Sequence, residues 1–119
     1  MFRLILDELL VTTAGALAVL FMDFEGETVE LVCDRDLNDH ELRVLGAYQN
    51  VFLTRLRGLC EQVSAGQLLR YKLEFEHLAV MSYDIKDGYY VVLLVDENVN
   101  EGVAWRRLER CRERLLAEM

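Results

Sequence analysis

The segment AGALAVLFMDFEGETVELVC, residues 14–33, contains the pattern that decides the fold. Between residues 16 and 23 both alternating sets of side chains are apolar, which is typical of a strand covered on both faces and therefore central in a sheet. The sequence DFEG at 23–26 predicts a hairpin turn, because its glycine can adopt a positive φ. Two glutamates interrupt the returning strand at 27–33, as expected near a sheet edge.

Three segments have the 3.6-residue period of amphipathic helices. The first covers residues 2–13. The second begins where Asn38 is followed three residues later by Glu41, the spacing of a capping box, and continues to about Val63. The third is C-terminal, and its predicted buried stripe consists of Ala104, Leu108, Cys111 and Leu115.

Three more strands are predicted between the second and third helices. Two of them cover residues 68–75 and 78–85, with an unmarked turn around Glu76-His77. The sequence KDG at 86–88 then predicts a hairpin, and residues 89–95 are again apolar on both faces. The expected order is therefore helix, two strands, helix, three strands, helix.

The long middle helix has two apolar stripes. We place the first on the sheet; it consists of Leu42, Leu45, Tyr48, Phe52, Leu56, Leu59 and Val63. The second lies roughly 130° around the helix, at 100° per residue, and consists of Val44, Val51 and Gly58 with Ala47 beside them. A helix resting on one sheet needs only the first stripe.

Length and charge limit the classes of protein to consider. The chain has 119 residues, no proline and no Gly/Ser-rich stretch, so we expect a single domain over residues 1–119. The net charge is −8; residues 1–100 carry 8 basic and 17 acidic side chains, whereas residues 101–119 carry 5 and 4. Such an acidic chain repels nucleic acids and anionic membranes, so neither is an expected partner.

Membrane insertion, metal binding and catalysis lack sequence support. The longest apolar run, 14–22, has nine residues where a spanning helix needs about 20, and we expect a cytoplasmic protein. His40 and His77 lack metal-ligand spacing, so no metal is expected. No phosphate-binding loop and no nucleophile elbow occur, so neither a cofactor nor an active site is predicted.

This element order resembles the Roadblock family, which includes dynein light chains and bacterial regulators of small Ras-like GTPases. The likeness rests on residues 14–20 with 23–27, on the strand-turn-strand at 82–95, and on the closing helix. It implies an α+β, longin-like fold, in which a five-stranded antiparallel sheet carries the middle helix on one face and the terminal helices on the other.

The resemblance also implies a homodimer, in which two copies join their sheets and lay their middle helices side by side. Ala47 and Gly58 would let the two helices approach closely, with Val44 and Val51 packed around them. The same helices commonly form the platform for a small Ras-like GTPase. The candidate dimer or partner residues are Arg43, Val44, Ala47, Asn50, Val51, Thr54, Arg55 and Gly58.

Four arginines of the closing helix lie within about 100° of arc: Arg106, Arg107, Arg110 and Arg114. They are candidates for docking an acidic partner, or for supplying an arginine to the phosphate site of a GTPase. The alternative is a solvated face neutralised by Glu109, Glu113 and Glu118.

The sequence therefore predicts a non-catalytic dimeric regulator that binds a small Ras-like GTPase and modulates its nucleotide state or localisation. One alternative is a dimeric structural adaptor that holds a larger complex together without changing GTP turnover. Another is a small ligand-sensing domain, with a pocket lined by Tyr71, Tyr83, Tyr89 and Tyr90.

Overall fold

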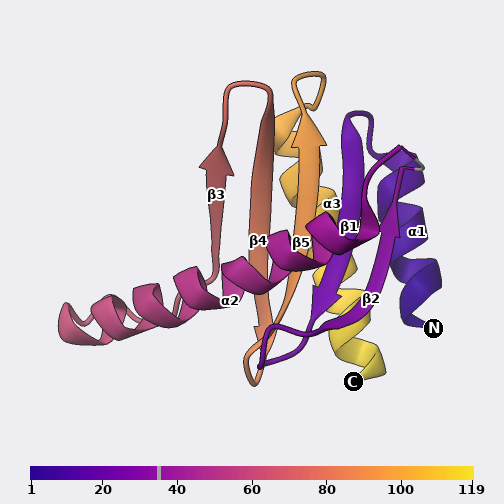
Figure 1. Ribbon diagram of the computed structural model, residues 1–119. Helices are drawn as coiled ribbons and strands as arrows, with labels where there is room; N and C mark the ends of the chain where they lie inside the picture. Colours follow the sequence, from indigo (N-terminus) through magenta and orange to yellow (C-terminus); the bar gives the residue numbers. More distant parts are fainter. Residues whose placement is uncertain (35) are drawn as a thin grey trace.

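Five strands form one antiparallel sheet in the order β2-β1-β5-β4-β3, which confirms the expected α+β architecture (Figure 1). The computed structural model describes residues 1–34 and 36–119. The strands are β1 (Ala16–Met22), β2 (Thr28–Cys33), β3 (Arg70–Glu74), β4 (Leu78–Lys86) and β5 (Tyr89–Asp96). The two strands that are apolar on both faces, β1 and β5, pair with each other inside the sheet, as their pattern predicts.

Three helices cover the two faces of this sheet. They are α1 (Phe2–Thr12), α2 (Asp39–Gln62) and α3 (Glu101–Glu118). Figure 1 shows α1 and α3 on one face and α2 crossing the other, so the order α-β-β-α-β-β-β-α is confirmed. The side chain of Asn38 accepts a hydrogen bond from the Glu41 backbone N–H at 2.9 Å, and this cap starts α2 where the sequence predicts.

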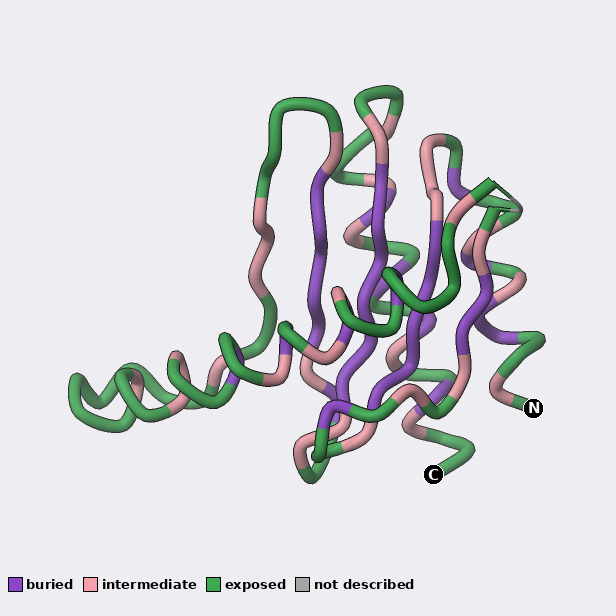
Figure 2. Tube along the Cα trace, in the orientation of Figure 1, coloured by how far each residue is buried: buried purple, intermediate pink, exposed green. Residues whose placement is uncertain are grey.

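The sheet separates two apolar cores, and its inner strands are the most continuously buried part of the chain (Figure 2). Alternate residues of β1 serve different cores: Val19 and Phe21 pack with α1 and α3, whereas Leu20 and Met22 pack with α2. Leu108 and Leu115 of α3 are fully buried in the first core. The sheet is therefore the middle layer of three.

The edge strand β3 is shorter than predicted. The sequence favours a strand over 68–75, but β3 covers only Arg70–Glu74. Its C-terminal limit is set by a tight hairpin, in which the Phe75 backbone N–H donates to Leu78 O at 2.8 Å. Leu69 is 63% exposed, so an apolar residue at this end does not mark a packed strand position.

The prediction that the first apolar stripe of α2 faces the sheet is wrong. Leu42 is buried and Leu45 and Leu56 are half-buried, but the rest of that stripe is exposed: Tyr48, Phe52, Leu59 and Val63. The buried row instead consists of Leu42, Gly46, Gln49 and Leu53. It lies roughly 75° around the helix from the predicted stripe, at 100° per residue. A glycine and a glutamine occupy two of its four positions, so apolarity alone does not reveal it.

No helix among residues 1–34 and 36–119 is long and apolar enough to cross a membrane.

Candidate interaction surface

A close contact and a polar network fix the position of α2 on the sheet. A Cβ atom on Gly46 would lie 2.9 Å from Leu20 Cδ2 and 2.9 Å from Met22 Cε, so any larger residue would force the ends of these two buried side chains to shift. The hydroxyl of Tyr90 donates to Gly46 O at 2.7 Å. Burial raises the pKa of Tyr90, which keeps this hydroxyl protonated as the donor.

Gln49 is the polar centre beneath the same helix. Its side chain is 2% exposed and accepts a hydrogen bond from the Tyr71 hydroxyl, while its amide nitrogen donates to Leu45 O at 3.1 Å. The Ser82 hydroxyl lies 3.5 Å from the same Gln49 oxygen. These bonds join α2 to β3 and β4, so they fix which face of the helix points away from the sheet.

The opposite side of α2 exposes a row of large apolar side chains, which we call the α2 outer face. Their exposed fractions range from 40% to 72%, in Val44, Tyr48, Val51, Phe52, Leu59 and Val63. They occupy about 120° of the helix circumference. A contiguous exposed apolar surface of this kind is typical of a protein-protein contact.

The C-terminal half of α2 projects past the edge of the sheet. Figure 1 shows it extending beyond β3, and residues 61–67, at its end and in the following loop, are exposed (Figure 2). No atom lies within 4 Å of a Cβ built on Gly58, the position predicted for a close helix contact. This part of α2 therefore has no sheet of its own beneath it.

The other predicted α2 residues separate into two groups. Val44, Val51, Thr54, Arg55 and Gly58 are exposed. Ala47 and Asn50 are half-buried beside the turn between β1 and β2, where a Cβ on Gly26 would lie 3.2 Å from Asn50 Cβ. Arg43 is exposed and pairs with Asp39 at 2.6 Å.

Of the two edge strands, β2 and β3, it is β3 that lies next to the projecting helix. Leu69 and Phe75, at the two ends of β3, hydrogen bond to β4 through their backbones at 2.9 and 2.8 Å. Alternate residues of an antiparallel strand bond to the same neighbour, so the backbone groups of Arg70, Lys72 and Glu74 face the open edge. An open strand edge is a template for pairing with another strand.

Side chains on β3 make contacts outside the strand. The Lys72 amine lies 2.6 Å from Glu74 and 3.2 Å from Glu101, and the hydrogen bond to Glu74 is the main cause that raises the pKa of Lys72. The guanidinium of Arg70 lies 4.4 Å from the ring centre of Trp105 in α3, a cation-π contact. The strand is thus held in place although only one of its edges is paired.

A cavity of about 450 Å³ lies between the end of α2 and the β4-β5 hairpin. Arg57 and Asp84 line it and form an ion pair at 2.5 Å, which joins α2 to β4. None of the four tyrosines suggested for a ligand pocket lines this cavity. The described residues also hold no group of three or more His, Cys, Asp or Glu side chains placed to bind a metal ion.

The arginines of α3 have different surroundings. Arg106, Arg107 and Arg110 are exposed, and Arg114 pairs with Glu8 of α1. Sequence reasoning missed a fifth, Arg112, which donates from Nε to Asp84 O at 2.5 Å and from Nη2 to Ile85 O at 3.0 Å. Arg112 lies outside the arc of the other four arginines, and its position in the sequence does not indicate that it is half-buried.

No protein-family model matches the sequence, and no curated protein matches it. Solved structures are nevertheless similar over nearly the whole chain. A Roadblock/LC7 domain from Streptomyces avermitilis superposes with a TM-score of 0.86 at 9% identity, covering 95% of this chain and 92% of that one. The gliding protein MglB from Thermus thermophilus has a TM-score of 0.85 at 18% identity, covering 95% of this chain and 84% of that one.

A third similar structure is described as MglB with a tetrameric arrangement. Its TM-score is 0.86 at 18% identity, and the match covers 95% of this chain and 83% of that one. Together with the strand order and the helix layers, these similarities establish that the chain has the Roadblock fold.

Proposed function

We propose that this chain is a dimeric regulatory adaptor that binds a small Ras-like GTPase and changes its nucleotide state or its location in the cytoplasm. The observation that carries the proposal is the projection of an apolar α2 past an open strand edge. In this proposal the chain has no active site of its own, and any effect on GTP hydrolysis comes from positioning the catalytic groups of the partner.

Geometry favours a second copy at this edge. If β3 pairs with β3 of another copy, the two sheets become one, and each projecting helix lies over the sheet of its partner. The two α2 helices then run side by side and cover the apolar outer face. The structure described as MglB with a tetrameric arrangement supports self-association in a protein of this fold.

The GTPase assignment rests on the resemblance to the Roadblock regulators and on the shared fold. Paired α2 helices form a broad surface in which the exposed Arg55 lies beside the apolar row. Such a surface, partly apolar and partly charged, is typical of a regulated, reversible protein contact.

The direct test is a pull-down from a lysate of the native cells, with the wild-type protein as bait and either a GTP analogue or GDP added. We expect mass spectrometry to identify a small GTPase enriched in one of the two nucleotide states. A turnover assay with the purified pair then distinguishes altered hydrolysis from recruitment. Recovery of a larger assembly that is indifferent to nucleotide would contradict the proposal and favour a structural adaptor.

The open edge of β3 gives a separate prediction, for the variant Lys72→Pro. The Lys72 N–H faces away from β4, so proline leaves the β3-β4 ladder intact but removes an edge donor. We expect the dimer dissociation constant, measured by analytical ultracentrifugation, to rise about thirtyfold, equivalent to about 2 kcal/mol.

Lys72→Ala is the matched control, since it removes the same ion pairs and keeps the backbone donor. It should dimerise as the wild type does. Equal weakening by both substitutions would show that the side chain, and not strand pairing, is responsible.

A further inference from the structure

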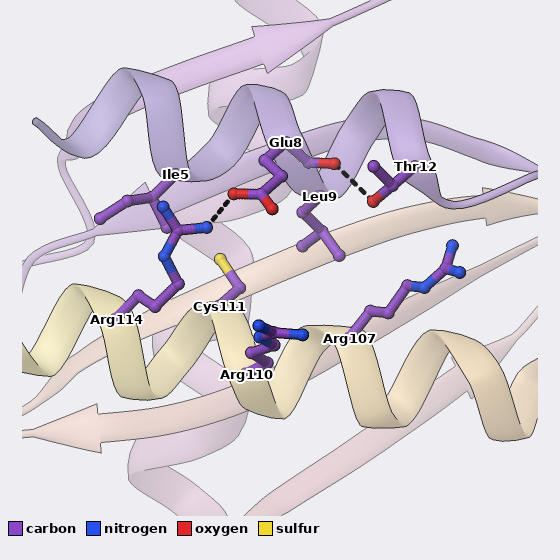
Figure 3. Close-up of a pocket in the computed structure, with 8 residues that line it drawn as sticks. All are labelled: Ile5, Glu8, Leu9, Thr12, Arg107, Arg110, Cys111 and Arg114. Atoms are coloured by element: carbon purple, nitrogen blue, oxygen red, sulfur yellow. Dashed lines mark hydrogen bonds and ion pairs between the residues drawn. The ribbon is translucent and has the colours of Figure 1, made fainter.

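A groove runs between α1 and α3, on the face of the sheet opposite α2 (Figure 3). Its volume is about 220 Å³. Ile5, Leu9 and Cys111 form an apolar floor, and each of these side chains is at most 5% exposed. Burial raises the pKa of the Cys111 thiol to about 12, so the floor is uncharged at neutral pH.

Three arginines of α3 line the same groove: Arg107, Arg110 and Arg114. In Figure 3 the Arg114 side chain reaches across to Glu8 of α1, with which it forms an ion pair. Arg107 and Arg110 form no ion pair within residues 1–34 and 36–119. Two exposed guanidinium groups are therefore uncompensated at this site.

Of the three glutamates expected to neutralise this helix, two contact other groups, whereas Glu113 is exposed and forms no ion pair among the described residues. Glu118 binds the N-terminal amine at 2.7 Å, and that contact lowers its pKa. Glu109 accepts a hydrogen bond from the Tyr83 hydroxyl at 3.3 Å. The groove lining itself holds three arginines and one glutamate, Glu8, so it is a local positive site on a protein whose net charge is −8.

We infer that the α1-α3 groove binds an acidic amphipathic segment of a protein partner, with carboxylates on Arg107 and Arg110 and an apolar side chain on the floor. Arginine binds carboxylates in a bidentate geometry, which matches the charge of such a segment. The volume is below the roughly 300–1,000 Å³ of typical small-molecule sites, so it suits one or two anchoring side chains.

This inference is independent of the proposed dimer and of the GTPase. The groove and the α2 outer face lie on opposite sides of the sheet, so both surfaces can be occupied at the same time. Loss of the dimer leaves the groove intact, and loss of the arginines leaves the α2 outer face intact. Failure of one hypothesis is therefore distinguishable from failure of the other.

The test uses a fluorescein-labelled helical peptide in which leucine repeats every three or four positions and glutamate occupies the rest. Fluorescence anisotropy with the full-length protein should show saturable binding that weakens as salt is raised. The double variant Arg107→Glu/Arg110→Glu should weaken binding at least about tenfold, because each reversal replaces attraction with repulsion. The changes in amide chemical shift on peptide binding, measured by NMR, should be largest for residues that line the groove.

Arg106→Glu is the matched control, because it makes the same charge change on the same helix at an exposed residue that does not line the groove. It should change the affinity less than twofold, and a peptide with glutamine in place of glutamate should not bind. The inference is overturned if the acidic peptide does not bind, if Arg106→Glu weakens it as much as the double variant does, or if anionic vesicles bind in its place.

Discussion

Val51→Glu is expected to convert the proposed dimer into a monomer. Val51 is 45% exposed on the α2 outer face, and pairing of two α2 helices would bury it. By symmetry, each dimer would then hold two unpaired carboxylates in an apolar contact. We expect the dissociation constant to rise at least about a thousandfold, equivalent to about 4 kcal/mol.

Light scattering coupled to size-exclusion chromatography, over a range of protein concentrations, measures this change. Val11→Glu is the matched control, because Val11 is 77% exposed on α1, on the other side of the sheet. Gly58→Arg should also give monomers, since it fills the open space beside the same helix. If Val51→Glu and Gly58→Arg both remain dimeric, the α2 outer face is not the dimer contact.

Gly46→Val should lower the free energy of unfolding by about 3 kcal/mol, the upper part of the range for overpacked cores. The added methyl groups would enter space occupied by Leu20 and Met22, both of which are fully buried. The helix would have to move away from β1, and the hydrogen bond from Tyr90 to Gly46 O would be strained.

The effect of packing on the free energy of unfolding can be separated from the effect of helix propensity by urea denaturation of two variants, Gly46→Ala and Gly58→Ala. Alanine gains about 0.5–1 kcal/mol over glycine in a helix interior, so Gly58→Ala should stabilise the monomer. Gly46→Ala receives the same gain but places Cβ 2.9 Å from two buried side-chain atoms, and should be destabilising overall. Equal stabilisation by both substitutions would refute the close contact.

The sheet was predictable because its strands differ plainly in pattern. Residues 16–22 and 89–95 are apolar at successive positions, and an interior strand with helices on both faces buries most of them. Asn38 marked the start of α2 because its cap is a local interaction between near neighbours. These features depend on short segments, which sequence displays directly.

The orientation of α2 was not predictable from apolarity. Its contact with the sheet depends on a glycine that allows close approach and on Gln49, whose burial is stabilised by partners from β3 and β4. Tyr48 and Phe52 resemble core residues but are 60% and 40% exposed. In a sequence, a large apolar side chain that is exposed on the surface cannot be distinguished from one that is buried in the core.

The arginines of α3 illustrate the same limit. Their spacing predicts that several lie on one arc of the helix. It does not predict which side of the helix faces α1. Arg112 binds backbone carbonyls of β4, a role that depends on how α3 lies across the sheet. Long-range packing, rather than local pattern, decides which arginines remain free.

The stacking of Arg70 on Trp105 links the open edge of β3 to the fluorescence of a tryptophan. Trp105 is the only tryptophan in the chain, so its emission is the sole indole signal and needs no label. The guanidinium above its ring belongs to the strand whose outer backbone groups have no partner within this chain's described residues. Any event that shifts this strand would change the electric field at the indole. The emission of Trp105 therefore reports on pairing at the open edge of β3.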